Sequence, residues 1–245
     1  MKWRKTAALV KYQLRIYVKE NRFLMPLVVM LVLLYFMYSI SPVDVVSSFS
    51  LSCYIIFSIM VWIGYTVSAA EDLVMEQIEM LRVESAWCYY MGKVLFVFVL
   101  GFAGTCLCLF FPVAVNMIKQ GQLFDRQLTL PDLLHAFFLL LGSSFAGGAL
   151  GSILHPTVMR ERKMALLLTI LAAVLTIIKG AAVQEISVLK WITWVLPPVN
   201  NVMGSYGHAE YFSFLQTLKI FLFLMTYGII YSMIKSAVSY KRKFG

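Results

Sequence analysis

Residues 94–117 read VLFVFVLGFAGTCLCLFFPVAVNM and contain no Lys, Arg, Asp or Glu. A helix needs about 20 apolar residues to cross the hydrocarbon core of a bilayer, and this stretch is long enough. It is apolar on every side when written as a helix, which is typical of a helix embedded in lipid rather than one on a soluble protein. The stretch therefore predicts a membrane span.

Five further segments share this character, namely 23–40, 49–70, 136–155, 164–183 and 214–234. Lys179 and Lys219 are their only charged residues, and each lies close enough to an end to reach the membrane surface. Six spans of about 20 residues occupy roughly half of the chain, so little is left for a soluble domain. We predict an all-α polytopic membrane protein in which residues 1–245 form one transmembrane domain.

The composition favours the same class, because 61% of the residues are hydrophobic, 13% are charged and the mean hydropathy is +0.82. Soluble domains carry about 25% charged residues. An ordinary soluble enzyme, a disordered chain and a DNA-binding protein are therefore excluded.

The net charge of +9 is distributed unevenly. With the N-terminus inside, the inner segments are 1–22, 71–93, 156–163 and 235–245. They hold sixteen of the 21 Lys and Arg residues and seven of the twelve acids, so the outer face sums to zero. Positive charge favours the cytoplasmic side, and this predicts that both termini are cytoplasmic. The excess of basic residues is therefore explained by membrane topology and does not indicate a surface for nucleic acid.

Residues 1–22 are predicted to form an amphipathic helix that lies in the inner membrane interface. Its apolar stripe consists of Trp3, Ala7, Val10, Leu14 and Tyr17, with cations on both flanks. Such a helix buries its apolar face in lipid and holds its cations near anionic headgroups. The alternative is a basic tail that serves only topology.

The spans contain no Asp or Glu, and the chain has no HExxH, GxSxG or Walker A motif. Proton-coupled carriers usually need an intramembrane carboxylate or His, so that class is disfavoured. We predict no catalytic residue, no metal ligand and no cofactor on this chain, which is therefore not expected to be an enzyme. If ATP drives the protein, another chain must bind it.

The segment 71–93 reads EDLVMEQIEMLRVESAWCYYMGK and holds five of the twelve acids. Ser68 followed by Glu71 fits a capping box at the start of a helix. Carboxylates such as Asp72 and Glu76 would be repelled by anionic headgroups, so a protein partner is more natural beneath this helix than lipid. The alternative is a solvated loop that tolerates acids.

The six spans, the basic start, the acidic helix and Gly92-Lys93 together resemble the permeases of ATP-binding cassette (ABC) exporters of the second integral-membrane class, the type V exporters. Glu71, then Glu79-Met80-Leu81, then Gly92-Lys93 match the family pattern, whereas Met75-Glu76-Gln77 stand where Gly-Thr is usual. The chain looks closest to small bacterial permeases for peptide or bacteriocin export or immunity.

The resemblance implies a coupling helix at 71–84 that docks on a separate ABC-type ATPase, which would hold ATP and Mg. Its contact residues would be Glu71, Asp72, Glu76, Glu79, Leu81 and Arg82. It further implies pairing with a second permease copy or a paralogue, and export of a hydrophobic or amphipathic substrate, for example a peptide, across the bacterial cytoplasmic membrane. The alternative function is a membrane-embedded enzyme or assembly factor without an ATPase partner.

Two further features match the family. Family members carry short re-entrant helices as an outer lid at the position of residues 184–213. This segment contains Trp191, Trp194, Pro197-Pro198, Asn200-Asn201 and Gly204. The second and fifth spans line the translocation path in the family. On the second span, one helix face bears Tyr54, Ser58, Trp62 and Tyr65. Aromatic residues with polar groups suit an amphipathic substrate, and ordinary helix packing is the alternative.

Gly147 and Gly151 form a GxxxG pattern on the fourth span. Small residues at this spacing let two helix backbones approach closely. A close helix contact is therefore expected, within one chain or between two subunits.

Overall fold

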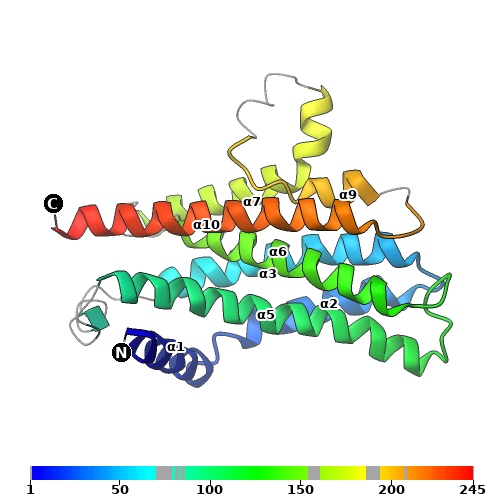
Figure 1. Cartoon of the computed structure of the whole chain (residues 1–245), viewed down its shortest axis with the longest axis horizontal. Coiled ribbons are helices and arrows are strands. Elements are labelled where there is room, and N and C mark those ends of the chain that lie inside the picture. Colours follow the sequence, from blue (N-terminus) through cyan, green and yellow to red (C-terminus); the bar gives the residue numbers. More distant parts are fainter. Residues whose placement is uncertain are drawn as a thin grey trace.

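The computed structural model describes residues 2–69, 79–80, 83, 86–153, 161–185, 194–206 and 209–244. Within these ranges every regular element is an α-helix, and an isolated parallel bridge joins Val43 to Phe124. The helices, drawn in Figure 1, are α1 (Lys2–Lys19), α2 (Leu24–Ser39), α3 (Val45–Ala69), α5 (Ala86–Ile118), α6 (Leu130–Ile153), α7 (Arg162–Glu185), α9 (Asn200–Tyr206) and α10 (Phe214–Phe244).

Five helices in the described ranges, α3, α5, α6, α7 and α10, are each long and apolar enough to cross a membrane. The remaining predicted span corresponds to α2, whose 16 residues extend about 24 Å at 1.5 Å per residue. That is shorter than the roughly 30 Å hydrocarbon core. A sixth crossing is counted only when α1 and α2, which meet at a bend of 76°, are taken together. The all-α class is thus confirmed for the described residues, and the five or six candidate spans are compatible with a polytopic membrane protein.

Two helices extend by two turns or more beyond the apolar runs that predicted them. The helix α5 begins at Ala86 rather than at residue 94, and α10 ends at Phe244 rather than at residue 234. The additional turns carry charged and aromatic residues. Such residues form regular helix about as readily as many apolar ones, but they lower the hydropathy by which a membrane span is recognised.

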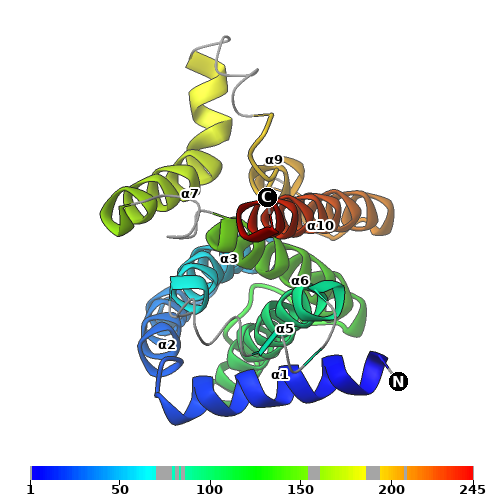
Figure 2. The ribbon, with the colours of Figure 1, turned by 90° about the vertical axis from the view of Figure 1, so that its left-hand side faces the viewer.

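The centre of the bundle is α6, which packs against α3, α10 and α5 (Figure 2). Ideal Cβ atoms built on Gly147 and Gly151 would lie 2.4 Å and 2.0 Å from the carbonyl oxygens of Phe57 and Val61. No other residue type allows this approach, so the GxxxG face of α6 lies directly on the backbone of α3. The predicted close contact is therefore made within the chain.

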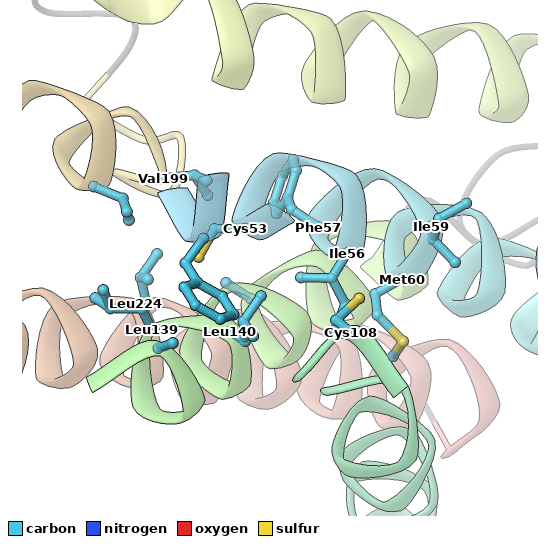
Figure 3. Packing of buried hydrophobic residues seen from close by; sticks show 14 of the residues in the cluster. Cys53, Ile56, Phe57, Ile59, Met60, Cys108, Leu139, Leu140, Val199 and Leu224 are labelled. Carbon is cyan, nitrogen blue, oxygen red and sulfur yellow. The ribbon is translucent and has the colours of Figure 1, made fainter. Parts of the chain in front are cut away.

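The main core is formed by apolar side chains from several helices (Figure 3). Ile56 and Phe57 of α3, Leu139 and Leu140 of α6 and Leu224 of α10 all belong to this core. All five side chains are fully buried. These three helices thus share one tightly packed interior.

Both termini lie at the same end of the bundle (Figure 1). At the opposite end, Arg126 forms a bidentate ion pair with Asp132, with N···O distances of 2.7 and 2.8 Å. The backbone N–H and the hydroxyl of Thr129 also donate to Asp132, so this carboxylate closes a capping box at the start of α6. The hydrogen-bonded Asp132 carboxylate raises the pKa of Arg126 above its usual value. That end of the bundle is held by charged hydrogen bonds.

The helix α1 lies against the first turns of α5 rather than apart from the bundle. Leu9, Val10 and Tyr17 are buried there, and Gly92 lets Leu9 approach, because a Cβ at Gly92 would lie 2.6 Å from Leu9 Cδ2. Trp3, a member of the predicted stripe, is 79% exposed. The stripe is therefore divided between a protein contact and open surface.

Candidate functional site

An apolar groove of about 430 Å³ runs between α3 and α7. Its walls consist of Ser58, Val61, Trp62 and Tyr65 on α3 and of Leu166, Thr169, Ile170, Ala173, Val174 and Ile177 on α7. Trp62 and Ile170 are 40% and 50% exposed, so the groove opens onto the apolar surface of the bundle. The second and fifth predicted spans thus meet around a space that a ligand could enter sideways.

Three of the four predicted path residues, Ser58, Trp62 and Tyr65, lie together on this groove. The hydroxyl of Ser58 donates to the carbonyl of Tyr54 at 2.8 Å, a bond within its own helix. The hydroxyl of Tyr65 donates to the carbonyl of Arg162 at 3.1 Å and joins α3 to the start of α7. Because these hydroxyls are used by backbone carbonyls, the groove presents mainly aromatic and aliphatic surface.

The fourth predicted path residue, Tyr54, has a different environment. Its hydroxyl donates to Asn200 Oδ1 at 3.0 Å and so attaches α3 to the short helix α9. A Cβ at Gly180 would lie 2.2 Å from Asn200 Nδ2, so α7 also approaches this amide closely. Tyr54 and Asn200 therefore join three helices beside the groove.

The backbone carbonyls of Trp194, Val195 and Leu196, just before α9, accept hydrogen bonds from α7 and α10. Tyr227 of α10 donates to the carbonyl of Trp194 at 2.7 Å, and the Tyr231 hydroxyl donates to that of Val195. Lys179 of α7 donates to the carbonyl of Leu196 at 3.4 Å. Figure 1 shows α9 near the end of the bundle away from the termini. Of the predicted outer segment 184–213, residues 186–193, including Trp191, and 207–208 lie outside the described residues.

Most of the predicted coupling helix lies outside the described residues, including Glu71, Asp72, Glu76, Leu81 and Arg82. Glu79 is described, and its Oε2 accepts a hydrogen bond of 3.4 Å from Gln13 Nε2 of α1.

Residues next to Glu79 in the sequence pack into a small apolar cluster. Val83 is buried in a cluster with Leu9 of α1 and Tyr89 of α5, and Met80 packs against the same cluster. The described residues of the acidic segment, Glu79, Met80 and Val83, thus contact α1 and α5 at the end of the bundle where the termini lie.

Two lysines are located near this end. Lys93 is 8% exposed, and its ammonium lies 4.3 Å from the centre of the Tyr89 ring. Lys235 donates to the hydroxyl of Ser68 at 2.8 Å and so joins α10 to α3. Lys93 is buried and needs such a partner, since an isolated buried cation is costly.

Nothing in the described part of the chain gathers three or more His, Cys, Asp or Glu side chains into a possible metal site. A scan against known protein families, a search of curated proteins and a search of solved structures each gave no match.

Asn200 was expected only as part of the outer segment 184–213 and not as the partner of Tyr54, and the α7 wall of the groove was not predicted. The wall residues, such as Ile170 and Val174, belong to a uniformly apolar run with no distinguishing pattern. Asn200 stands after Pro197-Pro198 in an apolar stretch, and a polar amide at such a place was the available signal.

Proposed function

We propose that the chain is the transmembrane permease subunit of an ABC exporter, which moves a hydrophobic or amphipathic substrate outward across the bacterial cytoplasmic membrane. A separate ATPase binds ATP and Mg and drives the transport. The observation that supports this proposal most directly is the groove between α3 and α7, which is apolar, open at the side and lined by Trp62 and Tyr65.

The size and chemistry of the groove fit this role. Sites for small molecules are usually concave, mostly apolar and about 300–1,000 Å³ in volume, and the groove has about 430 Å³. A substrate dissolved in the membrane could enter it without crossing water. In the described part of the chain no helix covers the open side of the groove, and only 17% of the residues in the α7 span are buried. A second permease, either a copy or a paralogue, would complete the enclosure.

The acidic segment supports the ATPase side of the proposal. Glu79 and Val83 attach it to α1 and α5, the helices that begin at the same end of the bundle. A partner that pushes on this segment would therefore act on α5 directly. In this reading the basic α1 also anchors the assembly to the cytoplasmic leaflet, with both termini inside.

Affinity purification of the full chain from its native membrane in mild detergent tests the proposal. We expect an ATP-binding subunit to co-purify in amounts comparable with the permease. Recovery of the folded permease without any nucleotide-binding partner would contradict the proposal and favour an enzyme or assembly factor.

Charge reversal tests where that subunit docks. The combined change Glu71→Lys, Glu76→Lys and Glu79→Lys should remove the partner by placing cations where acids are expected to contact it. The matched control is Glu210→Lys, because Glu210 is exposed and belongs to the predicted outer segment. Retention of both complex and transport in the triple variant would exclude a coupling role for the segment.

A further inference from the structure

The groove between α3 and α7 is long and narrow. Its residues on α7 extend from Leu166 to Ile177, a length of about 16 Å along a helix. Spread over that length, the groove volume of about 430 Å³ corresponds to a cross-section of about 26 Å². A helix with its side chains is about 10–12 Å wide, so its cross-section is about 80–110 Å². The groove therefore has room for one extended chain and not for a helix.

The polar groups of the groove do not suit an extended peptide. The hydroxyl of Thr169 donates to the carbonyl of Ala165 at 2.7 Å, and those of Ser58 and Tyr65 also donate to backbone carbonyls. Among the described lining residues, this leaves the indole N–H of Trp62 as the side-chain donor. A peptide strand of about 16 Å has about five carbonyl groups, and burying them without donors is costly. A hydrocarbon chain has no such groups and fits better.

The groove is open along its length. Leu166, Ile170 and Val174 lie on successive turns of α7 and are exposed, whereas Thr169, which also lines the groove, is buried. The first three therefore form the margin of the groove and Thr169 belongs to its floor. A chain can lie in the groove while the rest of the same molecule stays in the surrounding lipid.

One end of the groove lies with the chain termini. Tyr65, which lines the groove, donates to the carbonyl of Arg162 in the first turn of α7 at 3.1 Å. Ser68, one turn further along α3, accepts a hydrogen bond from Lys235 near the end of α10. The first turn of α7 is thus at the end of the bundle that is predicted to be cytoplasmic.

Two cations stand at this end of the groove. Arg162 and Lys163 are exposed, and they precede Leu166 by four and three residues. Helical spacing therefore places them on the side of α7 that lines the groove. Glu161 is also exposed, but it lies four residues before Ala165, which is buried and does not line the groove. This end of the groove is accordingly positive and complements an anionic group.

We propose that the groove binds one aliphatic chain of an anionic amphiphile, whose head lies beside Arg162 and Lys163, and that such amphiphiles are the substrate class of the exporter. The role as substrate rests on the export function proposed above. The inference narrows that function, because the chain in the groove is a hydrocarbon and not a peptide.

Native mass spectrometry of the full chain in a neutral detergent tests the site without any ATPase. The three probes carry chains of equal length and differ in the head. Palmitoyl-lysophosphatidylglycerol is anionic, palmitoyl-lysophosphatidylcholine is zwitterionic and hexadecyltrimethylammonium is cationic. We expect affinity to decrease in that order, with about two- to fivefold between the first two, the range for an exposed ion pair.

Charge removal tests the position of the head. The combined change Arg162→Gln and Lys163→Gln should abolish the preference for the anionic probe and leave the affinity for the zwitterionic probe unchanged. The matched control is Lys11→Gln with Arg15→Gln, which removes two exposed cations from α1 and should keep the preference. All four side chains are exposed, and Tyr65 bonds to the backbone of residue 162, so both variants are expected to fold.

Filling the groove tests the position of the chain. Ile170→Trp should weaken binding of all three probes, whereas Phe110→Trp, on exposed α5 surface, should not. A capped leucine pentapeptide should not displace the anionic probe. Equal affinity for the three heads, an unchanged preference in the Arg162 and Lys163 variant, unchanged binding in Ile170→Trp, or displacement by the pentapeptide would each overturn the proposal.

The proposed export function fails in a different way. If the folded chain is recovered without an ATPase but still selects the anionic probe, the binding site stands and its role in export is wrong. If the ATPase co-purifies and the chain does not select among the three heads, the export function stands and the substrate class is wrong.

Discussion

Gly151→Ala is expected to loosen the α3–α6 contact on which the bundle is built. The added Cβ would lie 2.0 Å from the carbonyl oxygen of Val61, whereas such contacts are essentially never shorter than 3.0 Å. The neighbour is backbone and not a flexible side chain, so the two helices must separate locally by about 1 Å. A gap of that size forfeits a quarter to a half of the dispersion energy of each affected atom pair.

The net cost follows from two opposing effects. Overpacking in a well-packed interior costs about 1–3 kcal/mol, and more when backbone must move. Alanine is about 1 kcal/mol better than glycine within a helix, which offsets part of the loss. We expect a decrease of about 2 kcal/mol in the free energy of unfolding. For a chain of this length, that corresponds to a Tm lower by about 4–8 °C.

Native cysteines provide the assay. Cys53, Cys88 and Cys108 are buried free thiols, and Cys106 is partly exposed. A fluorogenic maleimide should therefore react with Cys106 at low temperature and with the other three as the bundle opens in detergent. The melting curve of the full chain then reports the helix core itself.

Gly104→Ala is the matched control, because the added Cβ would lie 3.6 Å from Ile56 Cδ1, an ordinary contact. It should melt at or slightly above the temperature of the original chain. If Gly151→Ala also melted there, the close approach of α6 to α3 would not contribute to stability, and the packing argument would be wrong.

Three further changes have expected results. Ile170→Trp should fill the groove and reduce ATP-dependent efflux of a hydrophobic dye from vesicles without changing Tm, whereas Phe110→Trp, on exposed α5 surface, should leave efflux intact. Tyr54→Phe removes a hydrogen bond worth about 0.5–1.5 kcal/mol and should speed hydrogen exchange in residues 194–206. Arg126→Ala leaves a mostly buried carboxylate without its cation and should lower stability by about 2–4 kcal/mol, measured by denaturant titration.

The spans were predictable because the membrane imposes a length and a composition that one sequence displays directly. The run 94–117 located α5, and the small residues at 147 and 151 indicated a close contact. The first turns of α5, from Ala86, were not predictable from hydropathy, because their residues are mixed and their stability comes from packing against α1.

The candidate site was predictable on one wall only. Trp62 and Tyr65 are distinguishable on α3 because aromatic residues with polar groups recur there at helical spacing. The opposite wall is mainly aliphatic. When a helix is apolar on every side, its sequence does not indicate which face contacts which neighbouring helix. Tyr54 shared the α3 pattern but bonds to Asn200, a partner 146 positions away that no local pattern could supply.

Packing also determines which part of the bundle can move around the groove. The span of α6 is 72% buried and that of α7 is 17% buried, so separating α6 from its neighbours exposes far more apolar contact. Two described hydrogen bonds hold α7 on its neighbours. Tyr65 of α3 bonds to the start of α7, and Lys179 of α7 bonds to Leu196 in the segment before α9. A change in the width of the groove is therefore least costly as a displacement of α7 against a fixed α3–α6–α10 core. Such a displacement would carry the α7 wall with it and leave the Tyr54–Asn200 contact to hold α9 on α3.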